Sequence, residues 1–139
     1  MTLQSLIKKI DTISSVDELS SIKACVEESY AWINASFDST PVNQLVTGRA
    51  QFVDALLSHL WQLFGLDTVS ELSLCAVGGY GRGHLQPHSD IDLLIVSKKS
   101  LKPEVQEKIS LLQDLLIQVG DAEAEVILAK ASNNAKGKL

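Results

Sequence analysis

Residues 78–96 read GGYGRGHLQPHSDIDLLIV, and this segment indicates the fold more clearly than any other part of the chain. Four of the six residues from 78 to 83 are glycine. Glycine lets the backbone take positive φ and approach a ligand closely, and successive backbone N–H groups in such a turn can hold a phosphate. The turn has no Gly-Lys-Ser/Thr ending of the P-loop kind. His84 stands where a dinucleotide-binding pattern built on Gly79 and Gly81 needs its third glycine. The turn is therefore a candidate phosphate cradle of another kind.

Two aspartates follow this turn at a spacing of two. Asp90 and Asp92 precede an apolar run, residues 93–96, which is typical of a buried strand. Residues two apart on a strand point to the same face, so both carboxylates would project to one side. Such a pair repels itself, and Mg²⁺ offsets the repulsion because it binds one or two carboxylates together with substrate phosphates. The pattern predicts a Mg²⁺ site; the alternative is that Asp90 caps a turn and Asp92 is a solvated strand residue.

The residues before the glycines predict helices followed by one strand. Apolar residues recur at three- and four-residue steps over 3–10, in a second segment that ends near Ser36, and from about residue 43 to 64. Gly65 suits a helix C-terminal cap. Apolar and polar residues then alternate over 71–76, the period of a strand.

Helix boundaries are marked by residues with special backbone preferences. Ser15 and Glu18 have the spacing of a capping box, which predicts the start of the second helix. After the aspartates, Pro103 can open a helix near its first turn, and Gly120 can end it. Residues 122–128 are a possible third strand, although alanine and glutamate are weak strand formers.

Composition excludes several classes of protein. The chain has 139 residues, 45% of them apolar and 21% charged, as in ordinary folded domains. Its net charge of −5 argues against a broad nucleic-acid-binding surface. No apolar run approaches a membrane span, and the first residues lack a signal-peptide core. Cys25 and Cys75 have no metal-like spacing and are expected to be reduced thiols, so we expect a cytoplasmic protein without membrane contact.

The predicted fold class is α/β (α+β), a helical N-terminal portion followed by a small sheet. We expect a helical region over residues 1–66, a core over 67–130 and a disordered tail over 131–139. The tail carries lysines but no acidic residue and no apolar period.

The motif residues resemble a known family. The glycine turn followed by Pro87-His88-Ser89-Asp90-Ile91-Asp92-Leu93-Leu94 is similar to the signature of the bacterial PII uridylyltransferase/uridylyl-removing enzymes. These belong to the polymerase-β-like nucleotidyltransferase superfamily. Upstream, Val46-Thr47-Gly48-Arg49 and the helix through Leu60-Trp61 also resemble that family, and the likeness extends to about Gly120.

The resemblance implies a fold, a reaction and site residues. It implies a polymerase-β-like nucleotidyltransferase sheet and transfer of UMP from UTP to a tyrosine of the PII nitrogen-regulatory protein. Asp90 and Asp92 would bind catalytic Mg²⁺, and Ser89 would lie beside them. Gly78, Gly79 and Gly81 would hold the triphosphate. Arg82 either meets phosphate or forms a surface salt bridge.

The chain also departs from the family. His84 stands where the family usually has a glutamate, and the residues after Gly120 do not follow its pattern. Superfamily catalysis usually needs a third carboxylate on a later strand. Glu123 or Glu125 could supply it by position, or both could be solvated surface charges. The family's hydrolase and regulatory domains have no counterpart here, so we expect neither uridylyl removal nor glutamine sensing.

Two further hypotheses remain open at this stage. The same fold could serve an acceptor other than PII, either a small molecule or another protein. In the other hypothesis the core is catalytically incomplete, and the chain binds nucleotide or a partner protein without turnover. The missing match after Gly120 favours this second hypothesis.

Overall fold

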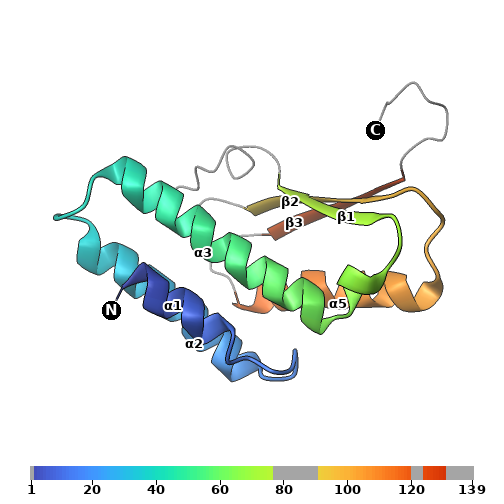
Figure 1. Cartoon of the computed structure of the whole chain (residues 1–139), viewed down its shortest axis with the longest axis horizontal. Helices are drawn as coiled ribbons and strands as arrows, with labels where there is room; N and C mark the ends of the chain where they lie inside the picture. The colour runs from blue at the N-terminus through green and yellow to red at the C-terminus, as the bar shows by residue number, and fades with distance from the viewer. Residues whose placement is uncertain (1, 77–90, 120–123, 131–139) are drawn as a thin grey trace.

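The computed structural model describes residues 2–76, 91–119 and 124–130 (Figure 1). The elements are α1 (Leu3–Ile10), α2 (Leu19–Ser36), α3 (Val42–Leu63), the 3-10 helix η1 (Leu66–Thr68), β1 (Leu72–Ala76), β2 (Ile91–Ser97), α5 (Pro103–Val119) and β3 (Ala124–Lys130). This order confirms the predicted fold class, with a helical N-terminal portion and then a small sheet.

The bounds of most elements lie within one or two residues of their predicted positions. The helix expected over 43–64 is α3, and Gly65 follows it in the left-handed conformation, with φ of 73°. The Gly65 N–H donates to the carbonyl of Gln62 at 2.9 Å, which confirms Gly65 as the C-terminal cap. The possible strand over 122–128 is β3, shifted by two residues. Its pairing with β2 outweighs the weak strand preference of its residues.

The capping box predicted at Ser15 and Glu18 is wrong. Glu18 is the N-cap of α2 rather than its third residue, and no side chain caps this helix. The Glu18 carboxylate instead accepts a hydrogen bond from the Ser14 hydroxyl at 2.5 Å. A capping box does form at α1, where Thr2 and Ser5 exchange hydrogen bonds of 3.1 and 3.0 Å. The sequence pattern missed it because serine, not glutamate or glutamine, occupies the third helical position.

The three N-terminal helices pack together, with α1 against both α2 and α3. Lys9 of α1 forms an exposed salt bridge with Glu28 of α2 at 3.0 Å, a contact of small energetic weight. The Nε2 atom of His59 in α3 lies 2.6 Å from the carbonyl oxygen of Ile13, so the ring donates to that carbonyl. This bond ties the α1–α2 connection to α3.

The close approach of α2 and α3 depends on a glycine. A Cβ atom at Gly48 would lie 2.7 Å from Cη2 of Trp32 on α2, closer than a real side chain tolerates. Next to it, Arg49 is only 5% exposed. Its guanidinium donates to the hydroxyl of Tyr30 at 3.3 Å and lies 5.6 Å from the centre of that ring. Gly48 therefore lets the two helices meet, and Arg49 links them.

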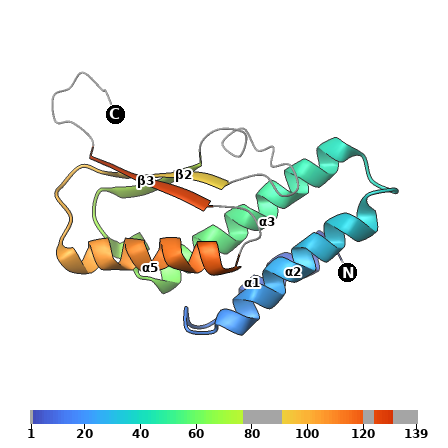
Figure 2. The same ribbon diagram turned by 180° about the vertical axis from the view of Figure 1, so that it is seen from behind.

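The described strands form a mixed sheet in the order β1-β2-β3. β1 is antiparallel to β2, whereas β2 and β3 are parallel. A parallel pair needs a crossover connection, and α5 lies within the connection between these two strands. In both views α5 runs along one side of the sheet, and it packs against β3 (Figures 1 and 2).

Only one face of β2 is buried, although the apolar run predicted a fully buried central strand. Leu93 and Ile95, 1% and 0% exposed, belong to one core cluster with residues of α1, α2, α3 and α5. Leu94 and Val96 point to the other face and are only half-buried. β2 is central as expected, and its second face is left more open by the described residues.

Other expectations concern the thiols, the membrane and the tail. Cys25 in α2 is buried, Cys75 in β1 is half-buried, and both are free thiols, as predicted. No helix in the described ranges is long and apolar enough to cross a membrane. The tail over 131–139 lies outside the described residues, so its disorder stays a prediction, as do the boundaries of the two regions.

Gly48→Ala tests the helix crossing. Alanine favours a helix over glycine by about 1 kcal/mol, but overpacking against Trp32 costs about 1–3 kcal/mol. We expect Gly48→Ala to lower the free energy of unfolding by up to roughly 2 kcal/mol. In a Trp32→Ala background the same change should raise it instead. Urea unfolding of the four proteins measures this coupling, and stabilisation in both backgrounds would contradict the crossing.

Candidate active site

Two of the predicted site residues lie on described strands. Asp92 is the second residue of β2, and Glu125 is the second residue of β3. The other predicted site residues, together with His84, lie outside the described residues: Gly78, Gly79, Gly81, Arg82, Ser89, Asp90 and Glu123. The geometry of the site therefore rests on the strands that flank them.

Three strand ends meet at one end of the sheet. Ala76, the last residue of β1, pairs with Leu93 near the start of β2. Ala124, the first residue of β3, pairs with Ile91, the first residue of β2. The segment 77–90 thus leaves the sheet and returns to it at the same end. The glycine-rich motif is joined to the end of the sheet that carries Asp92 and Glu125.

Asp92 and Glu125 are register partners on neighbouring parallel strands. Neighbouring strands lie about 4.8 Å apart, and register partners occupy the same face of a sheet. Two acidic residues directly opposite each other destabilise a sheet, and hard carboxylate oxygens are the ligands that Mg²⁺ prefers. The fold brings the position of one predicted metal ligand next to that of one candidate third carboxylate, so this pair of positions fits a divalent cation.

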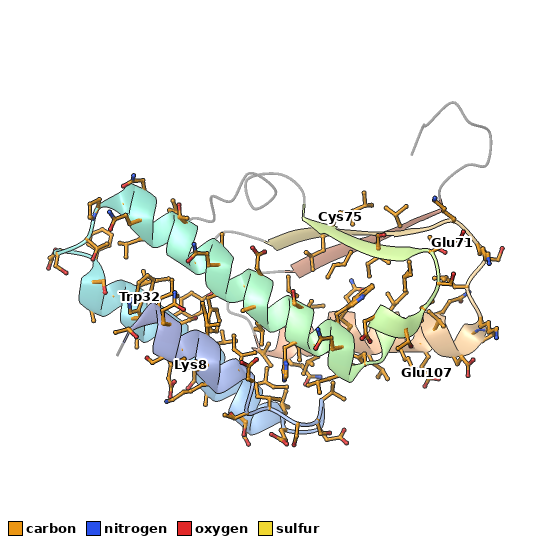
Figure 3. The ribbon with its side chains drawn as sticks, viewed as in Figure 1. Lys8, Trp32, Glu71, Cys75 and Glu107 are labelled. Carbon is orange, nitrogen blue, oxygen red and sulfur yellow. The ribbon has the colours of Figure 1, made fainter. Side chains whose placement is uncertain are left out.

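The face that carries Asp92 continues as a largely uncharged strip. Strand alternation places Leu94 and Val96 on this face, and their register partners on β1 are Cys75 and Ser73. Figure 3 shows Cys75 on β1, on the side of the structure away from α5. Cys75 is not among the site residues that the sequence predicted. The signal was present in the 71–76 alternation, where Cys75 has the opposite phase to the core-facing leucines.

The opposite face holds β2 in place. Leu93 and Ile95 belong to the same buried core as α5 residues such as Leu112, which is 1% exposed. Ser97 ends the strand at 2% exposure. Its hydroxyl donates to the carbonyl of Lys99 at 2.5 Å and accepts from the Lys99 N–H at 3.3 Å. The strand that carries Asp92 is therefore fixed by packing beneath it and by a turn at its far end.

The two cysteines differ in environment. Burial raises the pKa of the Cys25 thiol, and the nearby Glu28 carboxylate raises it further, while Lys9 acts in the opposite direction. Cys75 lies on the more open face and is half-buried. The thiolate is the reactive form of cysteine, so Cys25 is doubly protected, by its burial and by its raised pKa.

The part of the chain that forms this sheet matches a known protein family. Residues 57–134 match the family described as "Nucleotidyltransferase domain". The chain belongs to this family. The match begins in the second half of α3 and includes the glycine-rich motif, β2, α5 and β3.

Curated relatives carry a more specific name. This chain is 53% identical over 90 residues to the "Bifunctional uridylyltransferase/uridylyl-removing enzyme" of Vibrio cholerae, covering 62% of this chain and 10% of that enzyme. It is 42% identical over 127 residues to the protein of the same name in Vibrio campbellii, covering 88% of this chain and 14% of that enzyme. The Pseudoalteromonas translucida protein is 38% identical over 124 residues, covering 86% and 14%.

These matches confirm the resemblance that the motif indicated. The chain spans only 10–14% of the length of these relatives. No solved structure matches the chain. Membership of the nucleotidyltransferase family is thus shown by sequence similarity.

Two adjacent leucines test which sheet face is core and which carries Asp92. Leu93→Ala should lower the free energy of unfolding by about 2–5 kcal/mol, the usual cost of emptying a core leucine site. Leu94→Ala removes the same atoms from the half-buried face and should cost much less, about 1 kcal/mol. Chemical denaturation of the two variants gives both values. Equal losses would place Leu94, and with it the Asp92 face, in the core.

Thiol labelling tests the exposure of the same face. Under native conditions at pH 7–8, a maleimide should modify Cys75 well before Cys25, because Cys25 is buried and its pKa is raised. Mass spectrometry of peptides after timed labelling gives the two rates, and Cys25→Ser and Cys75→Ser variants assign them. Faster labelling of Cys25 would contradict the arrangement of β1.

Proposed function

We propose that this nucleotidyltransferase domain catalyses Mg²⁺-dependent transfer of UMP from UTP to a tyrosine hydroxyl of a PII-type signalling protein in the cytoplasm. The observation that supports the proposal most is the register of Asp92 with Glu125, at the end of the sheet to which the glycine-rich motif is joined. Without a cation, two acidic positions side by side on neighbouring strands are a cost to the fold. A bound cation would offset the repulsion between the two carboxylates.

The proposed metal ligands are Asp90 and Asp92, with Glu125 as the third carboxylate. When bound, Mg²⁺ would neutralise charge on the phosphates and on the leaving pyrophosphate. The register argues for Glu125 as a site residue rather than a solvated surface charge. Asp92 would hold the cation at the rim of a strand whose other face is packed into the core.

The triphosphate is assigned to the glycine-rich turn. Backbone N–H groups at Gly78, Gly79 and Gly81 would donate to phosphate oxygens, as glycine-rich turns do elsewhere. Arg82 would add a charged donor, and Ser89 would lie beside the metal ligands. These roles rest on the resemblance of the motif to the uridylyltransferase signature.

The transfer step needs no reactant other than UTP and the acceptor hydroxyl. The acceptor oxygen forms a bond to the α-phosphorus of UTP, and the bond from that phosphorus to pyrophosphate breaks. The hydroxyl proton leaves the acceptor, and Glu125 would accept it, because a carboxylate beside the reacting centre can act as a general base. The proton then passes to solvent.

The choices of base and acceptor are supported by similarity. The relatives are named uridylyltransferases, which supports UTP as the donor. The PII-type acceptor rests on the signature resemblance alone. The chain's net charge of −5 argues against a nucleic acid as the acceptor.

Calorimetric titration tests the nucleotide and metal site. UTP should bind the wild-type chain only when Mg²⁺ is present, and ATP should bind more weakly. Asp92→Asn and Glu125→Gln should each weaken Mg²⁺–UTP binding by at least roughly tenfold, since each removes one anionic ligand. Glu107→Gln is the matched control, because Glu107 is an exposed carboxylate on α5 (Figure 3). Equal UTP binding by all four folded proteins would refute the site.

A further inference from the structure

A pocket lies at the other end of the sheet from Asp92. It has a volume of about 550 Å³ and lies between the start of α5, the end of β2 and the turn around η1. Ser97 lines it, and Ser97 is five residues from Asp92 along β2, about 17 Å at 3.3 Å per residue. Pockets that hold small molecules have volumes of about 300–1,000 Å³, so this one is large enough for a small ligand and distinct from the nucleotide site.

The pocket is basic in an acidic chain. Residues 98–108 carry four lysines and two glutamates, a net charge of +2, whereas the whole chain has a net charge of −5. Lys99, Lys102 and Lys108 line the pocket, against a single lining carboxylate, that of Glu104. Like charges gathered at one cavity repel each other, and an anion between them would relieve this repulsion.

Lys108 lies toward the pocket rather than toward its nearest helical partner. Glu104 precedes Lys108 by four residues on α5, the favourable spacing for a helical ion pair. Yet within the described ranges neither Lys102 nor Lys108 forms a salt bridge. The Lys108 ammonium instead lies 3.7 Å from the place where a Cβ of Gly65 would be. The absent side chain of Gly65 thus leaves room for a cationic group on the pocket wall.

The opposite wall is held in shape by Glu71. This residue has a φ of 59°, in the left-handed region that costs a non-glycine residue energy. Its carbonyl accepts from the Lys98 N–H at 3.2 Å, and its carboxylate lies 3.7 Å from the Lys99 ammonium. Figure 3 shows Glu71 where β1 begins. Glu71 thus contacts both residues of the Lys98–Lys99 turn.

We propose that this pocket binds a small organic anion carrying phosphate or carboxylate groups. Lys102 and Lys108 supply the charge, while Lys99, whose ammonium lies 3.7 Å from the Glu71 carboxylate, lines the opposite wall. The first turn of α5, a helix of 17 residues, faces the same cavity with its positive end. The site is independent of the proposed nucleotide site, because it uses none of the residues assigned there.

Titrations with inorganic phosphate and with citrate test the proposal, each in Mg²⁺-free buffer at low ionic strength. The two arms distinguish phosphate from carboxylate chemistry. Calorimetry gives the affinity, and amide chemical shifts locate the ligand. We expect saturable binding of at least one anion, with shifts over residues 65–71 and 97–108. Asp92→Asn should leave this binding unchanged, which separates it from the nucleotide site.

Charge-matched double variants give the decisive comparison. Lys102→Gln/Lys108→Gln should weaken binding by roughly tenfold or more, because two charged donors are lost. Lys8→Gln/Lys23→Gln removes the same charge from exposed positions on α1 and α2 and should have little effect. Lys8 is labelled in Figure 3. The proposed anion site would be refuted if wild type showed no saturable binding, or if both double variants lost affinity equally.

Discussion

The structure depends on the two different faces of β2. On one face Leu93 and Ile95 are almost fully buried in the core that joins the helices to the sheet. On the other face, the strand brings Asp92 into register with Glu125 of β3. Burial of the leucine and isoleucine provides the hydrophobic stabilisation, whereas the acidic pair opposes strand pairing. The core face must therefore hold the strand firmly enough to keep two acidic positions in register.

The dependence of β2 on its buried face explains why the N-terminal helices matter to the candidate site. Gly48 allows α2 and α3 to meet, and the resulting core continues without interruption to α5 and β2. α5 then serves both ends of the sheet. Its last turn leads toward β3, which carries Glu125, and its first turn lines the lysine-rich pocket near Ser97. One strand and one helix thus connect two chemically opposite ends, one acidic and one basic.

Local sequence signals predicted the elements well but not their pairing. The extent of α3, its cap at Gly65 and the central place of β2 followed from periodicity and from the backbone freedom of glycine. The register of Glu125 with Asp92 did not, because a pairing across α5 leaves no mark in the local sequence. From sequence alone Glu123 and Glu125 were equivalent candidates.

The errors have similar causes. The pattern at Ser15 and Glu18 matched a capping box, but a turn delays the helix until Glu18 itself becomes the N-cap. The apolar run after Asp92 predicted burial on both faces, yet Leu94 is only half-buried because α5 lies along one face of the sheet. Burial on a second face depends on layers that no short run of residues encodes.

In the proposed site, Asp92 and Glu125 would hold one cation between adjacent strands. Urea unfolding of wild type and Asp92→Asn, with EDTA and again with Mg²⁺, tests this arrangement. Without divalent cations, Asp92→Asn should be more stable than wild type by up to about 1 kcal/mol, because a like-charge pair is removed. Mg²⁺ should stabilise wild type in proportion to its binding and stabilise the variant much less, because the variant has lost one anionic ligand. An equal response of both proteins to Mg²⁺, with Asp92→Asn less stable in EDTA, would show that Asp92 and Glu125 do not form one cation site.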